Sequence, residues 1–249
     1  MGRLCEKPLP PAVSRAVTGL YVRAYDVDLG DVAKISVPYP SFDAFFTRPL
    51  RAGARRLSDD AVVCPADGKL VDRGPVRADS RIVVKGRPYS VAELVGDEAD
   101  AAALAGGTFA VVYLSPRDYH RVHSPVAGTM GKVHGISGDL YPVNSIGERH
   151  VPDLFVRNQR VAMFIDTPAF GRIAVVMVGA MIVGRISVTA LPIPGTPLGI
   201  HRLSPAVPVA RGDEIGMFHL GSTVVVLGGR GLAFSRAPGP VLYGESLLS

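Results

Sequence analysis

The chain contains no tryptophan and only two cysteines among its 249 residues, and aromatic residues make up 7% of it. Cys5 lies near the start and Cys64 lies inside an apolar run, so a disulfide framework has no support. This cysteine usage predicts a protein of a reducing, cytosol-facing compartment. The longest apolar stretch, 173–184, has 12 residues including two glycines. It falls far short of the ~20 residues that span a bilayer.

Glycine and proline are abundant instead, with 28 and 21 residues, beside 47% hydrophobic and 20% charged residues. This composition predicts an ordered, turn-rich protein built from short strands more than from long helices. A chain of this length buries a sizeable core. We expect a helical N-terminal segment, 1–56, followed by a β-rich domain, 57–249.

The N-terminal segment is basic, because residues 1–56 carry nine Lys or Arg against five Asp or Glu. Pro10 and Pro11 suit the start of a helix. The apolar residues that follow recur at the spacing of one helix face: Val13, Ala16, Val17, Leu20, Tyr21 and Ala24. Arg15 and Arg23 flank this face. The pattern is typical both of a helix packed on its own domain and of one lying in the headgroup region of an anionic bilayer.

The rest of the chain predicts mostly strands. Apolar or β-branched runs bounded by Gly, Pro or Asp occur at 61–64, 81–85, 108–114, 161–165, 173–178, 181–189 and 223–227. Short helices are expected at 90–95, where Ser90 suits the N-cap, and at 97–104. The segment 192–208 has the composition of a loop. Several of the strand runs are almost continuously apolar, which is typical of buried sheets.

Four polar residues bear reactive groups: Asp67, His120, His123 and Ser222. A serine hydroxyl needs a base within hydrogen-bond reach, and the base needs a carboxylate to orient it. No G-x-S-x-G motif accompanies Ser222, which disfavours an ordinary α/β-hydrolase. The two histidines with Asp67 are also a candidate metal site, although Pro125 and Gly128 indicate a strand-to-turn region there. A structural role for the histidine pair stays open at this point.

Five motifs occur in a fixed order along the chain. They are FFTRPL (45–50), PADG (65–68), YHRVHSP (119–125), VGAMIVG (178–184) and LGST (220–223). A Gly-Ser-Thr tripeptide before an apolar run is by itself typical of a turn that leads into a strand. Together and in this order, the motifs resemble those of bacterial, pyruvoyl-dependent phosphatidylserine decarboxylase proenzymes of the LGST type. The resemblance extends from about residue 20 to the end of the chain.

The resemblance implies that the chain cuts itself between Gly221 and Ser222. His123 would act as the base on Ser222, Asp67 would orient His123, and the Ser222 hydroxyl would attack the carbonyl of Gly221 to give an ester. Elimination and loss of ammonia would leave a covalent pyruvoyl group, made from Ser222, at the start of a small chain, 222–249. The large chain would be 1–221.

The resemblance further implies decarboxylation of phosphatidylserine to phosphatidylethanolamine and carbon dioxide, through a Schiff base between the pyruvoyl ketone and the substrate amine. Decarboxylation of an amino acid needs an electron sink, which a cofactor usually supplies. The chain would make its own sink, and no metal is expected. His120 would return a proton to the α-carbon, a task in which a general acid typically contributes ~10²–10⁴-fold.

The implied fold is α+β and mainly β, with barrel-sandwich-like antiparallel sheets and an N-terminal helical layer. The resemblance places the protein peripherally on the cytoplasmic side of the cell membrane, with phosphatidylserine in an anionic membrane as its partner. It also implies a homodimer of the processed chain pairs. No nucleic-acid partner is expected.

Other motif positions allow more than one interpretation. Phe45 and Phe46 favour core packing over lipid contact, and Arg48 suits either a phosphate or an internal carboxylate. Gly68 suits a turn that aims Asp67, or a simple hairpin turn. Gly179 and Gly184 suit a close backbone approach or a bulge.

Two alternative functions stay open on the sequence alone. One is a noncatalytic lipoyl- or biotinyl-like carrier or a membrane-binding module, which would need an exposed lysine in a hairpin to act as a carrier and would not cut itself. The other is a zinc hydrolase that uses the two histidines and loses activity to chelators.

Overall fold

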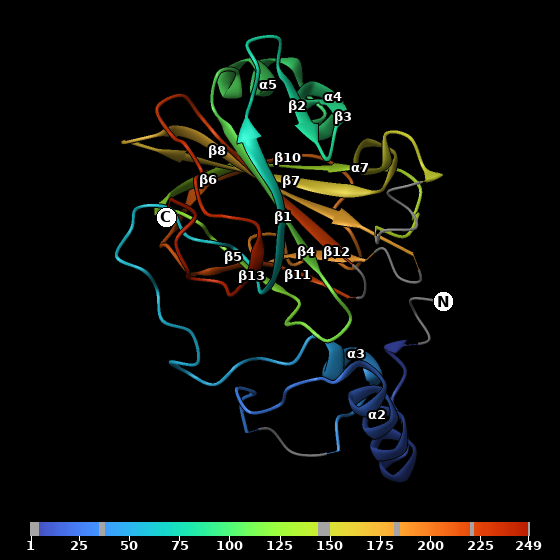
Figure 1. The fold of residues 1–249 in the computed structure, drawn as a ribbon. Helices are drawn as coiled ribbons and strands as arrows, with labels where there is room; N and C mark the ends of the chain where they lie inside the picture. Colours follow the sequence, from blue (N-terminus) through green and yellow to red (C-terminus); the bar gives the residue numbers. More distant parts are fainter. Residues whose placement is uncertain (1–4, 35–37, 144–149, 182–184, 220–221, 249) are drawn as a thin grey trace.

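A computed structural model describes residues 5–34, 38–143, 150–181, 185–219 and 222–248. The β-rich part, 57–248, forms layered antiparallel sheets, and helices of residues 5–56 lie against one end of them (Figure 1). We call the described residues up to 56 the N-terminal layer. The expected division between residues 56 and 57 stays a prediction.

The helices are α2 (Pro11–Tyr25), α3 (Phe42–Phe46), α4 (Val91–Val95), α5 (Glu98–Leu104) and α7 (Leu154–Arg157). The strands are β1 (Gly68–Pro75), β2 (Arg81–Val84), β3 (Arg87–Ser90), β4 (Thr108–Leu114), β5 (Arg121–His123), β6 (Gly128–Ile136), β7 (Arg160–Thr167), β8 (Gly171–Gly179), β9 (Ile186–Val188), β10 (Gly199–Val209), β11 (Glu214–Phe218), β12 (Ser222–Gly228) and β13 (Gly239–Val241).

Eight strands form the main sheet, in the order β10-β6-β7-β8-β12-β4-β1-β13, and all neighbours are antiparallel. Its central strand β12 is apolar on both faces. Val224 and Val226 enter one core and Val225 and Leu227 enter the other. Because successive side chains point to opposite faces, a strand covered on both sides must be apolar throughout. This explains the continuous apolar runs of the sequence.

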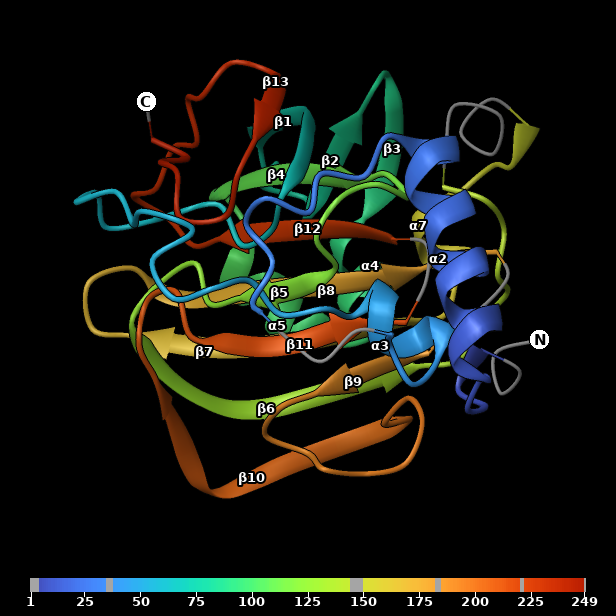
Figure 2. The ribbon, with the colours of Figure 1, turned by 90° about the horizontal axis from the view of Figure 1, so that it is seen from below.

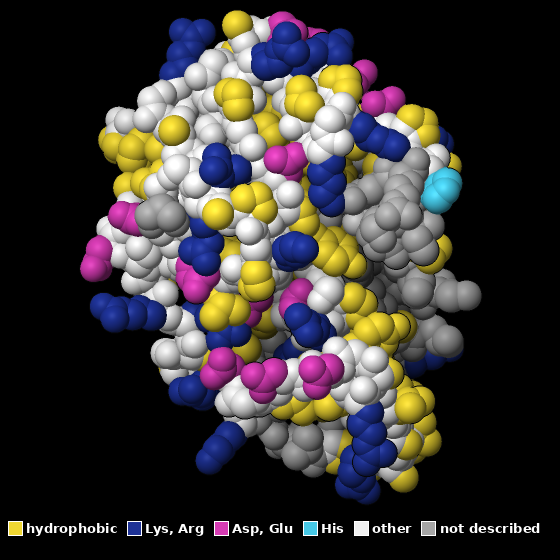
Figure 3. Space-filling view, viewed as in Figure 1, with side chains coloured by type: hydrophobic (Ala, Val, Ile, Leu, Met, Phe, Trp, Pro, Cys, Tyr) yellow, Lys and Arg dark blue, Asp and Glu magenta, His cyan; other side chains and the backbone are white. Residues whose placement is uncertain are grey.

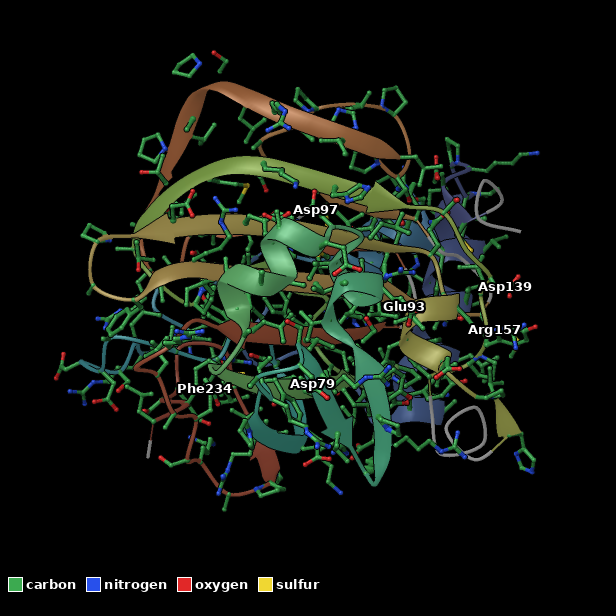
Figure 4. The ribbon with its side chains drawn as sticks, turned by 90° about the horizontal axis from the view of Figure 1, so that it is seen from above. Asp79, Glu93, Asp97, Asp139, Arg157 and Phe234 are labelled. Carbon is green, nitrogen blue, oxygen red and sulfur yellow. The ribbon has the colours of Figure 1, made fainter. Side chains whose placement is uncertain are left out.

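Different elements cover the two faces of the main sheet. The sheet β5-β11-β9 covers one face, and its Val122, Ile215 and Phe218 enter that core. The hairpin β2-β3 and the helices α4, α5 and α7 contribute to the other core. Seen from above, α4 and α5, which carry Glu93 and Asp97 at their starts, lie over the sheet strands (Figure 4). The arrangement is an open sandwich over the described residues, which confirms the expected mainly β, α+β class.

The N-terminal layer is held together by aromatic packing. Phe45 and Phe46 are fully buried, and the ring of Tyr21 on α2 meets both edge-on. The expectation of core packing for these two residues is therefore confirmed. The Tyr21 hydroxyl donates to the carbonyl of Pro116, which ties α2 to the β-rich part. Seen from below, α3 lies beside the ends of β9 and β11 (Figure 2).

The prediction of a loop over 192–208 was wrong for most of that segment, since β10 covers Gly199–Val209. Among the described residues this strand lies at the edge of the sheet and pairs only with β6. Its other side forms no hydrogen-bond ladder, so the strand tolerates Pro205 and Pro208, which lack a backbone N–H. Most of its side chains are exposed or half-buried. The apolar pattern that signals a strand is therefore missing.

Two predicted strands are also corrected. Residues 61–64 form only an isolated bridge at Val63. The side chains of 62–64 are buried because the segment packs against the C-terminal region, where Cys64 donates its N–H to the carbonyl of Glu245. Within 181–189 only β9 is a strand, and residues 182–184, which include Gly184, lie outside the described residues.

Candidate active site

The predicted site lies where four neighbouring strands of the main sheet, β8, β12, β4 and β1, begin or end. Ser222 is the first residue of β12, and its backbone lies between Leu114 at the end of β4 and Gly179 at the end of β8. Lys69 pairs with Tyr113, so Asp67 and Gly68, at the start of β1, lie at the same end of the strands. Gly221, the expected partner in the scissile bond, lies outside the described residues. The sheet register therefore places Asp67 and Ser222 at the same end of the strands.

Gly68 is required by a close approach of two strands. A Cβ atom at this position would lie 2.3 Å from the carbonyl oxygen of Tyr113. Such a contact is impossible for any side chain, so only glycine fits. Gly68 begins a strand, and the close packing fixes the backbone that carries Asp67.

The Asp67 carboxylate is buried and firmly held. Arg55 donates to it from Nε at 3.1 Å and from Nη2 at 2.5 Å, and the backbone N–H of Tyr243 donates at 2.9 Å. Arg55 also donates to Asp31 of the N-terminal layer. Two-point arginine pairing of this kind fixes the orientation of a carboxylate. Asp67 is thereby locked between the N-terminal layer and the C-terminal region.

His123 is buried and held from three sides. Its Nδ1–H donates to the carbonyl of Gly212 at 2.8 Å, so its Nε2 bears the lone pair and accepts from the Tyr119 hydroxyl at 3.1 Å. Its ring stacks on that of Tyr243 at 3.9 Å. Burial lowers the pKa of His123, which favours the neutral form that a base requires.

The hydrogen bond from His123 to Asp67 that the resemblance implies is not among the contacts of the described residues. The carbonyl of Gly212 occupies the orienting position on Nδ1 instead. Asp67 still lies close by, because the N–H of His123 donates to the carbonyl of Pro65. The two residues also share Tyr243, which bonds Asp67 through its backbone and stacks on His123 through its ring.

His120 lies at the other end of β5 and is fully buried against the ring of Phe46, at 4.0 Å. Its Nδ1–H donates to the carbonyl of Asp118 at 2.8 Å, so the lone pair lies on Nε2. Nε2 is buried and has no hydrogen-bond partner among the described residues. Burial lowers the pKa of His120 to about 3, which keeps the ring neutral near pH 7.

The two histidines therefore face different parts of the chain. The N–H of Phe218, on the strand that leads to Ser222, donates to the carbonyl of His120. His123 lies opposite Glu214 at the far end of the same strand pair and beside the PADG segment. A buried polar atom without a partner is rare in proteins and needs a reason. Nε2 of His120 is such an atom, on a residue whose carbonyl bonds to Phe218, four residues before Ser222.

A cavity of about 570 Å³ opens between the N-terminal layer and the β-rich part. Asp67, Tyr119, Arg48 and Arg55 are among its lining residues. Arg48 is buried, donates to the carbonyl of Arg117 and lies over the Phe45 ring, and its Nε and Nη1 have no hydrogen-bond partner among the described residues. The described residues contain no group of three or more His, Cys, Asp or Glu side chains that could hold a metal. The zinc interpretation thus has no ligand set in this part of the chain.

Sequence reasoning missed Arg55, Gly212 and Tyr243, which hold the predicted site residues. Their contacts join positions far apart in the chain, and no local pattern signals them. Tyr119 had a signal, because it is the first residue of the YHRVHSP motif.

Comparison with known proteins identifies the family. The family model described as phosphatidylserine decarboxylase matches residues 42–249. A phosphatidylserine decarboxylase proenzyme of Bordetella avium is 41% identical over 99% of this chain and 88% of its own length. Proenzymes of the same name from Pseudomonas aeruginosa and Azotobacter vinelandii are 43% and 44% identical, over 91% and 92% of this chain and 83% of each relative.

A match of this extent makes the protein an enzyme, a carboxy-lyase. The chain belongs to the phosphatidylserine decarboxylase family. This confirms the resemblance seen in the five motifs. It also removes the noncatalytic carrier or membrane-binding module as the main function.

Proposed function

We propose that this chain decarboxylates phosphatidylserine to phosphatidylethanolamine after cutting itself between Gly221 and Ser222. The observation that carries the proposal is the family match over 42–249, together with the position of Ser222. Ser222 begins β12 at the same end of the main sheet's strands as Asp67, and it follows β11, which pairs with the segment that carries the two buried histidines.

In the proposed maturation, the Ser222 hydroxyl loses its proton to His123 and attacks the Gly221 carbonyl. The peptide C–N bond breaks and an ester forms. Elimination then breaks the bond between Cβ and Oγ of Ser222 and releases the large chain with Gly221 as its terminal carboxylate. Water replaces the nitrogen of the remaining group and ammonia leaves. The sequence of steps consumes one water and needs no external oxidant.

The Nε2 lone pair of His123 supports its role as the base. The neutral ring already accepts the hydroxyl proton of Tyr119 at that atom, so the atom is a competent acceptor. Asp67 would position His123 through Tyr243, which contacts both residues. We therefore infer that Asp67 is a positioning residue in this reaction.

The pyruvoyl group, when formed from Ser222, would supply the electron sink that decarboxylation needs. The partnerless Nε2 of His120, near the strand end that leads to Ser222, fits a site where a substrate atom is still to arrive. Because Nε2 carries a lone pair, it can take up a proton released by the ammonium group of the substrate, and a proton held on a histidine of such low pKa is readily given up. His120 is therefore suited to return a proton to the α-carbon, and its burial keeps competing water away.

We also propose peripheral attachment to the cytoplasmic side of the cell membrane through α2. Val13, Val17 and Leu20 leave an apolar face exposed, with Leu20 70% exposed. Hydrophobic side chains gather over α2 beside basic ones (Figure 3). Apolar contact combined with basic flanks binds helices to anionic lipid surfaces. In the described residues, no helix combines the length and apolarity needed to cross a bilayer.

A decarboxylation assay with phosphatidylserine vesicles tests the function. The wild-type chain should release carbon dioxide and form phosphatidylethanolamine, and Ser222→Ala should do neither. Ser222→Cys retains a nucleophile and should cut slowly. An active Ser222→Ala protein would refute the proposal. The processed chain pairs are expected to form a homodimer, which a sedimentation experiment on the same samples would check.

A further inference from the structure

His219 lies three residues before Ser222, at the end of β11, and the roles above do not use it. Its side chain is only 5% exposed and both ring nitrogens have partners. Nδ1 lies 2.7 Å from Oδ1 of Asp43 on α3, and Nε2 lies 3.0 Å from the hydroxyl of Ser187 on β9. The carboxylate accepts from Nδ1–H, and Nη2 of Arg185 lies 2.5 Å from the same nitrogen. These contacts fix both the plane and the tilt of the ring.

The backbone of Phe218 and His219 is held by hydrogen bonds as well. The N–H of His219 donates to the carbonyl of Arg185 at 3.0 Å, and the N–H of Phe218 donates to the carbonyl of His120 at 2.9 Å. Arg185 pairs in turn with Asp43, at 3.0 Å from its second carboxylate oxygen. The strand end before the scissile segment is thus bonded to β5, to β9 and to the N-terminal layer.

The helix α3 contacts the side chains of both His219 and His120. Asp43 holds His219, and Phe46, three residues further along the same helix, packs on His120. Asp43 is itself held within its helix turn, because its carbonyl accepts the Thr47 hydroxyl. A largely buried network of hydrogen bonds and ion pairs favours one arrangement of its members, although Nε of Arg185 has no partner among the described residues. The arrangement fixed here is that of the chain leading into Gly221 and Ser222.

We propose that Asp43, acting through His219, is a positioning residue for self-cleavage. It holds the strand end so that the Gly221 carbonyl stays within reach of the Ser222 hydroxyl. The N-terminal layer is then part of the maturation machinery. This inference rests on the proposed cleavage between Gly221 and Ser222. Misplacement of reacting atoms by about 1 Å can cost ~10²-fold in rate, so loss of this contact should slow cutting markedly.

Timed cell-free synthesis, with the uncut fraction followed on denaturing gels, tests the proposal. Asp43→Asn and His219→Leu should slow cutting by ~10–10²-fold. Asp43→Glu, which keeps the carboxylate, should recover part of the rate. Asp100→Asn is the control, because Asp100 is a buried carboxylate that, like Asp43, pairs with two side chains, here Lys132 and Arg172 of a different cluster.

Thermal unfolding of the same variants, each combined with Ser222→Ala to keep the chains uncut, separates positioning from stability. Asp100→Asn should lower the unfolding temperature at least as much as Asp43→Asn, yet cut at the wild-type rate. If Asp43→Asn and His219→Leu cut as fast as wild type, or if cutting follows the unfolding temperature in all variants, the inference is wrong. A wild-type chain that never cuts would instead refute the proposed function itself.

Discussion

At the scale of single residues, the two histidines of the YHRVHSP motif differ in what occupies their Nε2 atoms. Nε2 of His123 accepts from Tyr119, whereas Nε2 of His120 is buried without a partner among the described residues. Both rings donate from Nδ1 to a backbone carbonyl, so both present the same tautomer. The difference supports separate roles, with His123 in maturation and His120 in turnover.

Alanine variants of the two histidines should therefore fail at different stages. His123→Ala should accumulate uncut chain because Ser222 lacks its base. Asp67→Asn should do likewise. His120→Ala should still cut, yet form product ~10²–10⁴-fold more slowly, because the α-carbon lacks its proton donor. Fragment yield on gels and phosphatidylethanolamine formation measure the two stages separately.

Tyr119→Phe is the control for this experiment. It keeps the ring and removes only the hydroxyl that occupies Nε2 of His123, so cutting should proceed at least as fast as in wild type. The assignment of roles is reversed if His120→Ala stays uncut while His123→Ala matures. A Tyr119→Phe chain that stays uncut would instead make the hydroxyl part of the proton path.

His120 should also leave a signature in the pH dependence of stability. Its pKa falls from an ordinary 6.5 to about 3, so the unfolded chain binds a proton between these values that the folded chain does not. Its contribution to the free energy of unfolding is therefore present above pH 6.5 and is lost as the pH falls towards 3. Over this range His120 lowers the free energy of unfolding by at most about 1.4 kcal/mol for each pH unit that the pH falls.

Urea unfolding of an uncut Ser222→Ala chain measures this slope, and His120→Gln should make it shallower over the same pH range. Parallel curves for the two chains would show that His120 is protonated in the folded protein. The other ionisable groups are common to both chains, so the comparison isolates the histidine.

At the scale of elements, α2 has two faces with different surroundings. Tyr21 packs on α3 and bonds Pro116, whereas Val13, Val17 and Leu20 are exposed. The sequence left internal packing and membrane contact open as alternatives, and the helix has a face for each.

Leu20→Asp should release the protein from anionic vesicles without unfolding it. Binding of the unchanged chain should strengthen with the fraction of anionic lipid and weaken with salt. Leu198→Asp is a matched control, because Leu198 is also exposed but lies outside the N-terminal layer. Vesicle flotation and circular dichroism give the two readouts. Equal loss of binding in both variants would contradict a role for α2.

The elements that could be predicted from the sequence are those whose environment is uniform. β4, β8 and β12 are buried on both faces, and their apolar runs are unmistakable. β1 and β6 escaped prediction because glycine and charged residues interrupt them, and β10 because an edge strand tolerates proline and exposure. The N-caps at Ser90 and Asp97 are local, so α4 and α5 could be predicted.

At the scale of the whole molecule, the sandwich places the start of β12, with Ser222, at the same end of the strands as the PADG motif, which also bonds to the YHRVHSP motif. The motif residues Asp67, His120, His123 and Ser222 could be proposed from the sequence because they lie in the motifs that carry the resemblance to the family. The groups that hold them could not, since Arg55, Gly212 and Tyr243 become neighbours only through the packing of the N-terminal layer and the C-terminal region. The structure also replaces the expected direct contact between Asp67 and His123 with one through Tyr243.

The central claim is that this chain becomes an enzyme by cutting itself between Gly221 and Ser222. Mass spectrometry of the denatured, purified protein tests it most directly. Two chains are expected, 1–221 and 222–249, with the smaller one blocked at its N-terminus by a keto group and reactive towards hydrazides. A single uncut chain of 249 residues with full decarboxylase activity would show that self-cleavage is not needed.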